Sequence, residues 1–316
     1  AAIYMIIRAF FILLFLLAAA SATADFFGER GATAQTLSSV KHENARERSE
    51  RENLFANISL EARAAYVIDA RTGDVLYEKN AELQLPLASL AKVMTALVAR
   101  EIAADAVVTV TAGALAAEGD SGLLLNERWY IADLADFTLI TSSNDGARAR
   151  SSVGALFVDE HTAEGERSFV AAMNEKARAL GMSQTFFVNE TGLDESGEVS
   201  GAYGSAEDVA LLLAYILRTY PELLSATTHK EMSIVSLDAV HVATNTNVLA
   251  SRIPGLIASK TGFTDLAGGN LAIAFEAGPL RPIIVVVLGS TEEGRFEDVS
   301  ALVDAAITEI SHTGAK

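Results

Sequence analysis

The chain has 316 residues, of which 50% are hydrophobic and 21% are charged, so it can bury a substantial core. Its formal net charge of −17 argues against nucleic acid as a partner, because phosphates would be repelled. It contains no cysteine, which excludes disulfides and thiolate metal sites.

The first segment, residues 1–24, has the pattern of an export signal. Arg8 precedes a charge-free apolar run that is shorter than the roughly 20 residues needed to span a bilayer. Ala22-Thr23-Ala24 is typical of a signal-peptide cleavage site. We therefore expect a signal peptide, with an uncleaved N-terminal membrane anchor as the alternative. Residues 25–56 lack an apolar stripe and predict a polar, charged linker, which leaves 57–316 as the folded domain.

Two strand-like segments open this domain. Residues 64–69 and 75–78 are joined by the turn Arg71-Thr72-Gly73-Asp74, a pattern typical of a hairpin. The apolar run 90–98 follows Pro86 and predicts a buried helix, because proline is tolerated where a helix starts. The chain is thus expected to pass from a sheet into a buried helix.

The start of that helix carries a serine and a lysine that can touch. Ser89 and Lys92 are three residues apart, so they share one face of a helix. A serine hydroxyl is a poor nucleophile until a neighbouring group takes its proton. Burial disfavours the ammonium form of a lysine and makes it a better base. Alone, the pair is a weak signal, because a surface serine near a lysine is common.

Helices dominate the middle of the chain and strands return at its end. Further helices are predicted over residues 131–140, 166–180 and 206–219, the last stopped by Pro221, and a closing amphipathic helix over 296–310. Strands are predicted over 255–260, 270–276 and 282–288, and the last is apolar on both faces, as in a central strand. The pattern indicates an α/β (α+β) fold, with an antiparallel sheet built from both chain ends, flanking helices and an inserted all-helical lobe.

Two further motifs join the Ser89–Lys92 pair. Ser142-Ser143-Asn144 follows a predicted helix, and Lys260-Thr261-Gly262 ends a predicted strand. The ordered set Ser-x-x-Lys, Ser-x-Asn and Lys-Thr-Gly is the signature of penicillin-binding proteins and class A β-lactamases. We expect the three motifs to converge in a cleft between the lobe and the sheet.

With these residues the chain resembles the serine D-Ala-D-Ala carboxypeptidases, the low-molecular-mass penicillin-binding proteins. The resemblance spans about residues 64–289 and implies a penicillin-binding protein or β-lactamase-like fold, with 57–316 as a transpeptidase-like catalytic domain. Its segments are Tyr66-Val67-Ile68-Asp69-Ala70, Ala88-Ser89-Leu90-Ala91-Lys92-Val93-Met94-Thr95, Leu139-Ile140-Thr141-Ser142-Ser143-Asn144-Asp145, Asn189-Glu190-Thr191-Gly192-Leu193-Asp194 and Lys260-Thr261-Gly262-Phe263-Thr264. The family usually has Thr in place of Ala91 and Pro in place of Glu190, and neither departure is expected to touch the chemistry directly.

The resemblance implies the catalytic roles. Ser89 is the expected nucleophile that forms an acyl-enzyme, and Lys92 is the expected general base. Ser142 is expected to relay a proton to the leaving amine. No metal or organic cofactor is expected.

The resemblance also implies a substrate-binding set: Asn144, Lys260, Thr261, Gly262 and Phe263. Asn144 would orient the substrate amide or Lys92. Lys260 would supply a positive charge and Thr261 a hydrogen bond to the terminal carboxylate, while Gly262 lets the backbone approach closely. The backbone N–H groups of Ser89 and Phe263 would form the oxyanion hole.

These features predict an exported serine D-Ala-D-Ala carboxypeptidase that trims peptidoglycan stem peptides in the cell envelope and is inhibited by β-lactams. The membrane would be contacted only through the N-terminal segment. A DD-endopeptidase or transpeptidase of the same family shares the motifs and remains an alternative. A β-lactamase is less favoured, because residues 187–194 lack the Glu and Asn spacing of class A deacylation. A catalytically inactive wall-binding protein is also less favoured, because Ser89, Lys92 and Lys260 are all present.

Overall fold

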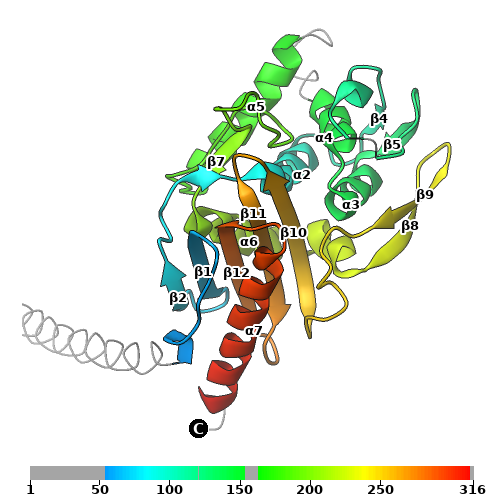
Figure 1. The fold of residues 1–316 in the computed structure, drawn as a ribbon. Coiled ribbons are helices and arrows are strands. Elements are labelled where there is room, and N and C mark those ends of the chain that lie inside the picture. The colour runs from blue at the N-terminus through cyan, green and yellow to red at the C-terminus, as the bar shows by residue number, and fades with distance from the viewer. Residues whose placement is uncertain (1–53, 120, 154–162, 314–316) are drawn as a thin grey trace, which may run out of the picture. The chain divides into compact units, whose positions relative to one another are not determined.

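The computed structural model describes residues 54–119, 121–153 and 163–313 (Figure 1). The chain divides into two units, residues 1–56 and 57–316, and the second carries all of the sheets and the helices α2 to α7. The expected signal segment, residues 1–24, lies outside the described residues, as does most of the expected linker.

A five-stranded antiparallel sheet forms the centre of the second unit, in the order β10-β11-β12-β1-β2. Its strands are β1 (Ala64–Asp69), β2 (Val75–Lys79), β10 (Leu256–Thr264), β11 (Gly268–Glu276) and β12 (Pro282–Ser290). Strands from both ends of the domain pair directly, because β1 lies antiparallel to β12 from Ala64↔Leu288 to Asp69↔Ile283. The sheet predicted from both chain ends is confirmed, and so is the β1–β2 hairpin.

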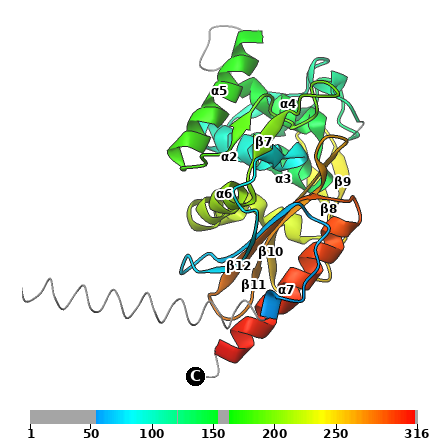
Figure 2. The ribbon, with the colours of Figure 1, turned by 60° about the vertical axis from the view of Figure 1, so that its left-hand side comes forward.

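Helices cover both faces of this sheet (Figure 2). Helix α7 (Gly294–Thr313) packs against β11 and β12 on one face, and α6 (Ala206–Thr219) packs on the other. Residues 283–288 of β12 are completely buried between them, as expected of a central strand. Pro221 follows α6 and begins the 3-10 helix η4 (Pro221–Thr228), where its missing N–H leaves no hydrogen bond unmade.

The segment between β2 and β10 forms a lobe that is only partly helical. Besides α6 and η4, its described helices are η1 (Ala88–Leu90), α2 (Ala91–Ala103), η2 (Ala114–Ala116), α3 (Ile131–Thr141), α4 (Asn144–Ser151) and α5 (Ala163–Ala179). Small antiparallel sheets accompany them: β4 (Val107–Thr109) with β5 (Arg128–Tyr130), β8 (Glu231–Val235) with β9 (Val240–Thr244), and β3 (Leu85–Pro86) with β7 (Ala202–Gly204) and β6 (Phe186–Phe187). The expectation of an all-helical lobe is therefore corrected, because strands this short show too little alternation to be recognised.

Helix α2 is the centre of the lobe. Every residue from Ala91 to Ala99 is buried, and α3, α4 and α5 pack around the helix. The 3-10 turn η1 leads into α2 and contacts β10 and β11 of the main sheet. The serine at position 89 therefore lies on a 3-10 turn after a small sheet, rather than in an α-helix leaving the central sheet. The contact of η1 with β10 and β11 is called the seam between the lobe and the sheet.

In the described part of the chain no single helix is long and apolar enough to cross a membrane, although the sharply bent pair of α6 and η4 meets the requirement by length and composition alone.

Candidate active site

Ser89 and Lys92 meet at the junction of η1 and α2. The Lys92 Nζ donates to Ser89 Oγ at 2.7 Å and to the carbonyl oxygen of Thr191 at 2.8 Å. Lys92 is fully buried, and this burial lowers the pKa of its ammonium group from 10.5 to about 7, against the opposing effect of the Glu190 carboxylate. Near neutral pH a sizeable fraction of Lys92 is therefore uncharged and able to take the proton of Ser89.

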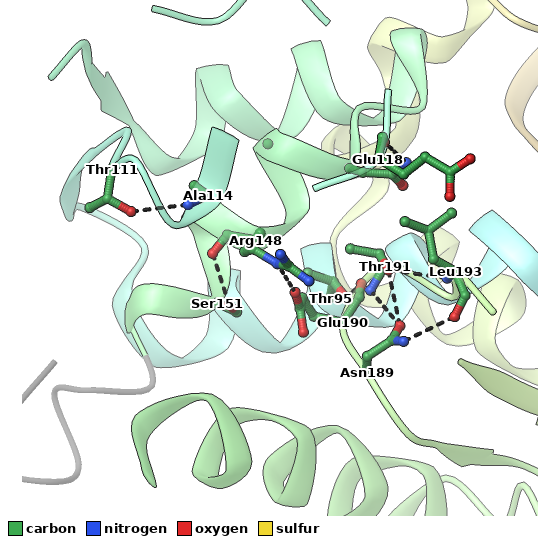
Figure 3. Close-up of polar contacts among 12 residues, drawn as sticks. Thr95, Thr111, Ala114, Glu118, Arg148, Ser151, Asn189, Glu190, Thr191 and Leu193 are labelled. Atoms are coloured by element: carbon green, nitrogen blue, oxygen red, sulfur yellow. Dashed lines mark hydrogen bonds and ion pairs between the residues drawn. The ribbon is translucent and has the colours of Figure 1, made fainter. Parts of the chain in front are cut away.

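The backbone beside Ser89 is tightly constrained. Ala88 has a φ of +48°, in the left-handed region that alanine rarely adopts. Gly192, with a φ of +77°, faces it so closely that any side chain there would overlap the Ala88 carbonyl. The Asn189 side-chain oxygen accepts hydrogen bonds from the backbone N–H groups of Thr191 and Gly192, which holds this loop in place (Figure 3).

Ser142 and Lys260 form a second serine–lysine contact across the seam. Ser142 ends α3 with a φ of +61°, and its hydroxyl accepts a hydrogen bond from Lys260 Nζ at 2.8 Å. Burial lowers the pKa of Lys260 well below its usual value, and the charges of Lys92 and Arg295 lower it further. Two ammonium groups this close repel each other, so the state in which both Lys92 and Lys260 are charged is disfavoured.

The Lys-Thr-Gly motif lies inside β10 instead of ending the strand. The predicted strand end is corrected, because pairing with β11 continues to Thr264↔Gly268. A Cβ at Gly262 would lie 2.9 Å from the Leu87 carbonyl oxygen and 3.2 Å from the Ser89 nitrogen. Glycine is thus required for β10 to run against η1, and this contact aligns the Lys260 strand with the nucleophile turn.

Asn144 and Phe263 lie at the margin of the site. The Asn144 amide donates to the Glu118 carbonyl at 2.7 Å, and no hydrogen bond joins it to Lys92 in the described structure. Of the two expected arrangements, orientation of Lys92 by Asn144 is not observed. Phe263 is 43% exposed, with its ring centre 6.0 Å from the Arg295 guanidinium carbon.

Further residues reach the site without any sequence motif. The Thr246 hydroxyl lies 2.5 Å from that of Thr261, and Arg295 of α7 donates to the Gly262 carbonyl at 2.9 Å. Sequence analysis missed them because these contacts join positions 15 and 33 residues apart in the chain, in the loop after β9 and on α7. No group of three or more His, Asp or Glu side chains suited to a metal ion occurs among the described residues.

The chain is similar to known proteins over most of its length. Residues 49–292 match the family described as D-alanyl-D-alanine carboxypeptidase. The chain is 32% identical over 266 residues to D-alanyl-D-alanine carboxypeptidase DacF of Bacillus subtilis, covering 80% of this chain and 64% of that protein. It is 32% identical over 257 residues to D-alanyl-D-alanine carboxypeptidase DacC of Escherichia coli, covering 77% of this chain and 60% of that protein. The chain thus spans less than two thirds of the length of these relatives.

Solved structures are similar over most of the described domain. Penicillin-binding protein D2 of Listeria monocytogenes, determined in its ampicillin-bound form, has a TM-score of 0.67 and 32% identity, covering 79% of this chain and 98% of that chain. A D-alanyl-D-alanine carboxypeptidase of Mycobacterium tuberculosis has a TM-score of 0.69 and 25% identity, covering 79% and 92%. The expected penicillin-binding protein fold is confirmed by these similarities.

Proposed function

The chain belongs to the D-alanyl-D-alanine carboxypeptidase family, and from this we propose that it removes the terminal D-Ala from peptidoglycan stem peptides through an acyl-enzyme on Ser89. The observation that carries the proposal is the 2.7 Å hydrogen bond between Ser89 Oγ and a fully buried Lys92. That pair supplies a nucleophile and a base of suitable pKa in one place.

Acylation would begin with proton transfer from Ser89 Oγ to neutral Lys92 as the oxygen attacks the scissile carbonyl. The backbone N–H groups of Ser89 and Phe263 would stabilise the resulting oxyanion, and each such donor is worth about 3 kcal/mol. Collapse breaks the C–N bond, and the leaving amine takes the proton that Lys92 received from Ser89, so that Lys92 is neutral again. Ser142 is suited to relay that proton, because its hydroxyl is hydrogen-bonded to Lys260 Nζ.

Deacylation would reverse the roles. Water attacks the acyl carbonyl, its proton passes to Lys92, and Ser89 leaves as the regenerated hydroxyl. The shortened stem peptide is released, and the site returns to its starting protonation state.

Recognition of the substrate carboxylate would fall to Lys260 and Thr261. Burial and neighbouring cations disfavour charge on Lys260 in the free site, and a bound carboxylate would favour its ammonium form. The charge is thus present when the anionic end of the substrate is bound. Asn144, on the other side, has an amide oxygen without a hydrogen-bond partner in the described structure, and this oxygen could accept from a substrate amide.

We propose that residues 57–316 act outside the cytoplasmic membrane, with residues 1–24 as the signal peptide or anchor. The charge-free run after Arg8 supports this location. A β-lactam is expected to act as an inhibitor by acylating Ser89, since a similar structure was determined with ampicillin bound.

The test is intact-mass spectrometry after incubation with penicillin, followed by digestion of defined muropeptides. A stable adduct on Ser89 that is lost in Ser89→Ala, with release of free D-Ala, is the expected result. Cleavage of cross-links or formation of new ones would indicate the DD-endopeptidase or transpeptidase activity instead. An unmodified wild-type protein, or an adduct on another residue, would overturn the assignment of the nucleophile.

A further inference from the structure

Glu190 is a buried carboxylate that has no part in the acyl transfer proposed above. Its side chain is 6% exposed and lies on the loop between β6 and β7. Its Oε1 is 3.3 Å from the Nε of Arg148 on α4, whose side chain is 34% exposed. Figure 3 shows the Glu190 carboxylate directed at Arg148, beside Thr95 of α2. A buried carboxylate with one partly solvated partner keeps a strong influence on nearby charges.

The backbone of the same loop is hydrogen-bonded to α2. Thr95, three residues beyond Lys92 on α2, donates from its hydroxyl to the Glu190 carbonyl at 2.6 Å. The next carbonyl, that of Thr191, accepts the hydrogen bond from Lys92 Nζ at 2.8 Å. Glu190 is therefore adjacent in the chain to a direct partner of Lys92, and two hydrogen bonds fix its place against α2.

Other charged groups surround the helix. On the elements packed against η1 and α2 these are Lys260 on β10, Glu276 on β11, Asp133 and Asp136 on α3, Asp145, Arg148 and Arg150 on α4, and, among the described side chains of α5, Glu175, Lys176 and Arg178. Lys176 is paired with Glu101, and Asp136 acts on Arg150, whose guanidinium donates to the Ala96 carbonyl. Lys260 repels a charge on Lys92, whereas Glu190 is the carboxylate that favours it.

We propose that Glu190 is a positioning residue that stabilises the protonated form of Lys92, and that Arg148 holds its carboxylate in place and moderates its effect. An opposite charge in a buried setting favours the ammonium form of a lysine. Glu190 thus opposes the lowering of the Lys92 pKa by burial, and it raises the pH at which Lys92 becomes neutral. The effect on rate rests on the proposed function, but the protonation of Lys92 can be measured without it.

The test uses Glu190→Gln in the full chain, because glutamine keeps the shape and can still accept a hydrogen bond from Arg148. The midpoint of Lys92 is followed by NMR titration of isotope-labelled lysine, with its signal assigned by its loss in Lys92→Met. We expect the midpoint to fall by about half a pH unit to one unit. The acidic limb of the penicillin acylation rate should move to lower pH by the same amount, because Lys92 then becomes neutral at a lower pH.

Two matched variants serve as controls, with thermal melts to check folding. Glu190→Asp keeps the charge and should leave the Lys92 midpoint near that of the wild type. Glu198→Gln removes one negative charge from an exposed position of the same loop and should cause no shift. An unchanged or raised midpoint in Glu190→Gln, or an equal shift in Glu198→Gln, overturns the proposal.

A loss of acylation rate in Glu190→Gln that is the same at every pH, with no shift of the Lys92 NMR midpoint or of the acidic limb, would mean that Glu190 is only structural. This also overturns the proposal. If the wild-type protein is not acylated by penicillin, the proposed function fails, while the NMR midpoint of Lys92 still decides the present inference.

Discussion

Two buried lysines with opposite requirements lie on either side of the seam. In the proposed mechanism, Lys92 has to be neutral for part of the time to accept the proton of Ser89, whereas Lys260 has to be charged when a carboxylate is bound. Burial lowers the pKa of both, and the charge of Lys92 lowers that of Lys260 further. The division of work between them therefore depends on the substrate, whose carboxylate favours charge on Lys260.

Replacement of Lys92 by arginine tests its role as the base. Arginine keeps a positive charge and cannot be deprotonated in a protein. Lys92→Arg should therefore lower the penicillin acylation rate by about 10²–10⁴-fold, the usual contribution of general-base catalysis. Lys260→Arg is the control, since it keeps the charge and should lose part of kcat/KM through altered geometry. Near wild-type acylation of Lys92→Arg would mean that the proton leaves through Ser142 or water.

The pH dependence of acylation should follow Lys92. Its pKa is lowered to about 7, mainly by burial, and in the proposed mechanism the neutral form is the base. The rate constant should therefore rise with pH along an acidic limb centred near that value, falling about tenfold for each pH unit below it. Stopped-flow acylation from about pH 5 to about pH 9 measures this limb. A rate that is flat across neutral pH would contradict the assignment.

At the level of single residues, sequence analysis succeeds where contacts are local. The Ser89–Lys92 contact follows from a spacing of three residues and is present in the structure. The departure at Glu190 is not expected to touch the chemistry directly, and the structure places its carboxylate against Arg148 and its carbonyl against the Thr95 hydroxyl of α2. That hydrogen bond joins positions 95 residues apart in the chain, and no periodicity reports on such a contact.

Among the elements, the amphipathic helices were predicted well and the short polar ones were missed. Helix α6 has the predicted bounds, with Ser205 accepting from the Asp208 nitrogen at its start. Helix α4 was missed because Asn144–Ser151 is rich in polar residues and has no apolar stripe to signal a helix. Its start is nevertheless marked by Ser143, whose hydroxyl accepts from the Gly146 nitrogen.

The contact between β10 and η1 can be tested with one methyl group. Gly262→Ala places a Cβ within 2.9 Å of the Leu87 carbonyl oxygen and 3.2 Å of the Ser89 nitrogen, so the strand and the turn must separate. We expect a loss of about 1–3 kcal/mol in unfolding free energy, and at least about tenfold slower acylation by penicillin. Thermal melts and acylation rates measure the two effects.

Gly197→Ala is the control for this substitution, because its Cβ would meet no atom within 4 Å and its φ is not positive. It should leave both acylation and stability nearly unchanged. Equal behaviour of the two variants would show that close approach of β10 to η1 is not required.

For the whole molecule, both ends of residues 57–316 are joined at the same place. The Asp298 carboxylate of α7 accepts hydrogen bonds from the backbone N–H groups of Glu61 and Ala62, at 2.9 and 2.8 Å, just before β1. It also accepts from the Ser290 hydroxyl at 2.7 Å, at the end of β12. The sheet pattern at the two chain ends was predictable, but this polar junction was not, because its partners lie 236 and 237 residues apart.

This closure predicts that a chain shortened to residues 57–316 folds by itself. It retains β1, β12 and α7 together with the backbone groups that bind Asp298, and it keeps Ser89, Lys92 and Lys260. We expect a soluble protein with one cooperative thermal transition, and release of D-Ala from a D-Ala-D-Ala peptide at a rate within about twofold of the chain that begins at residue 25. Asp298→Ala in the shortened chain should lower its unfolding free energy by about 2–4 kcal/mol, because three donors lose their partner. Aggregation of the shortened chain that is relieved by restoring residues 25–56 would instead show that this segment is needed for the fold.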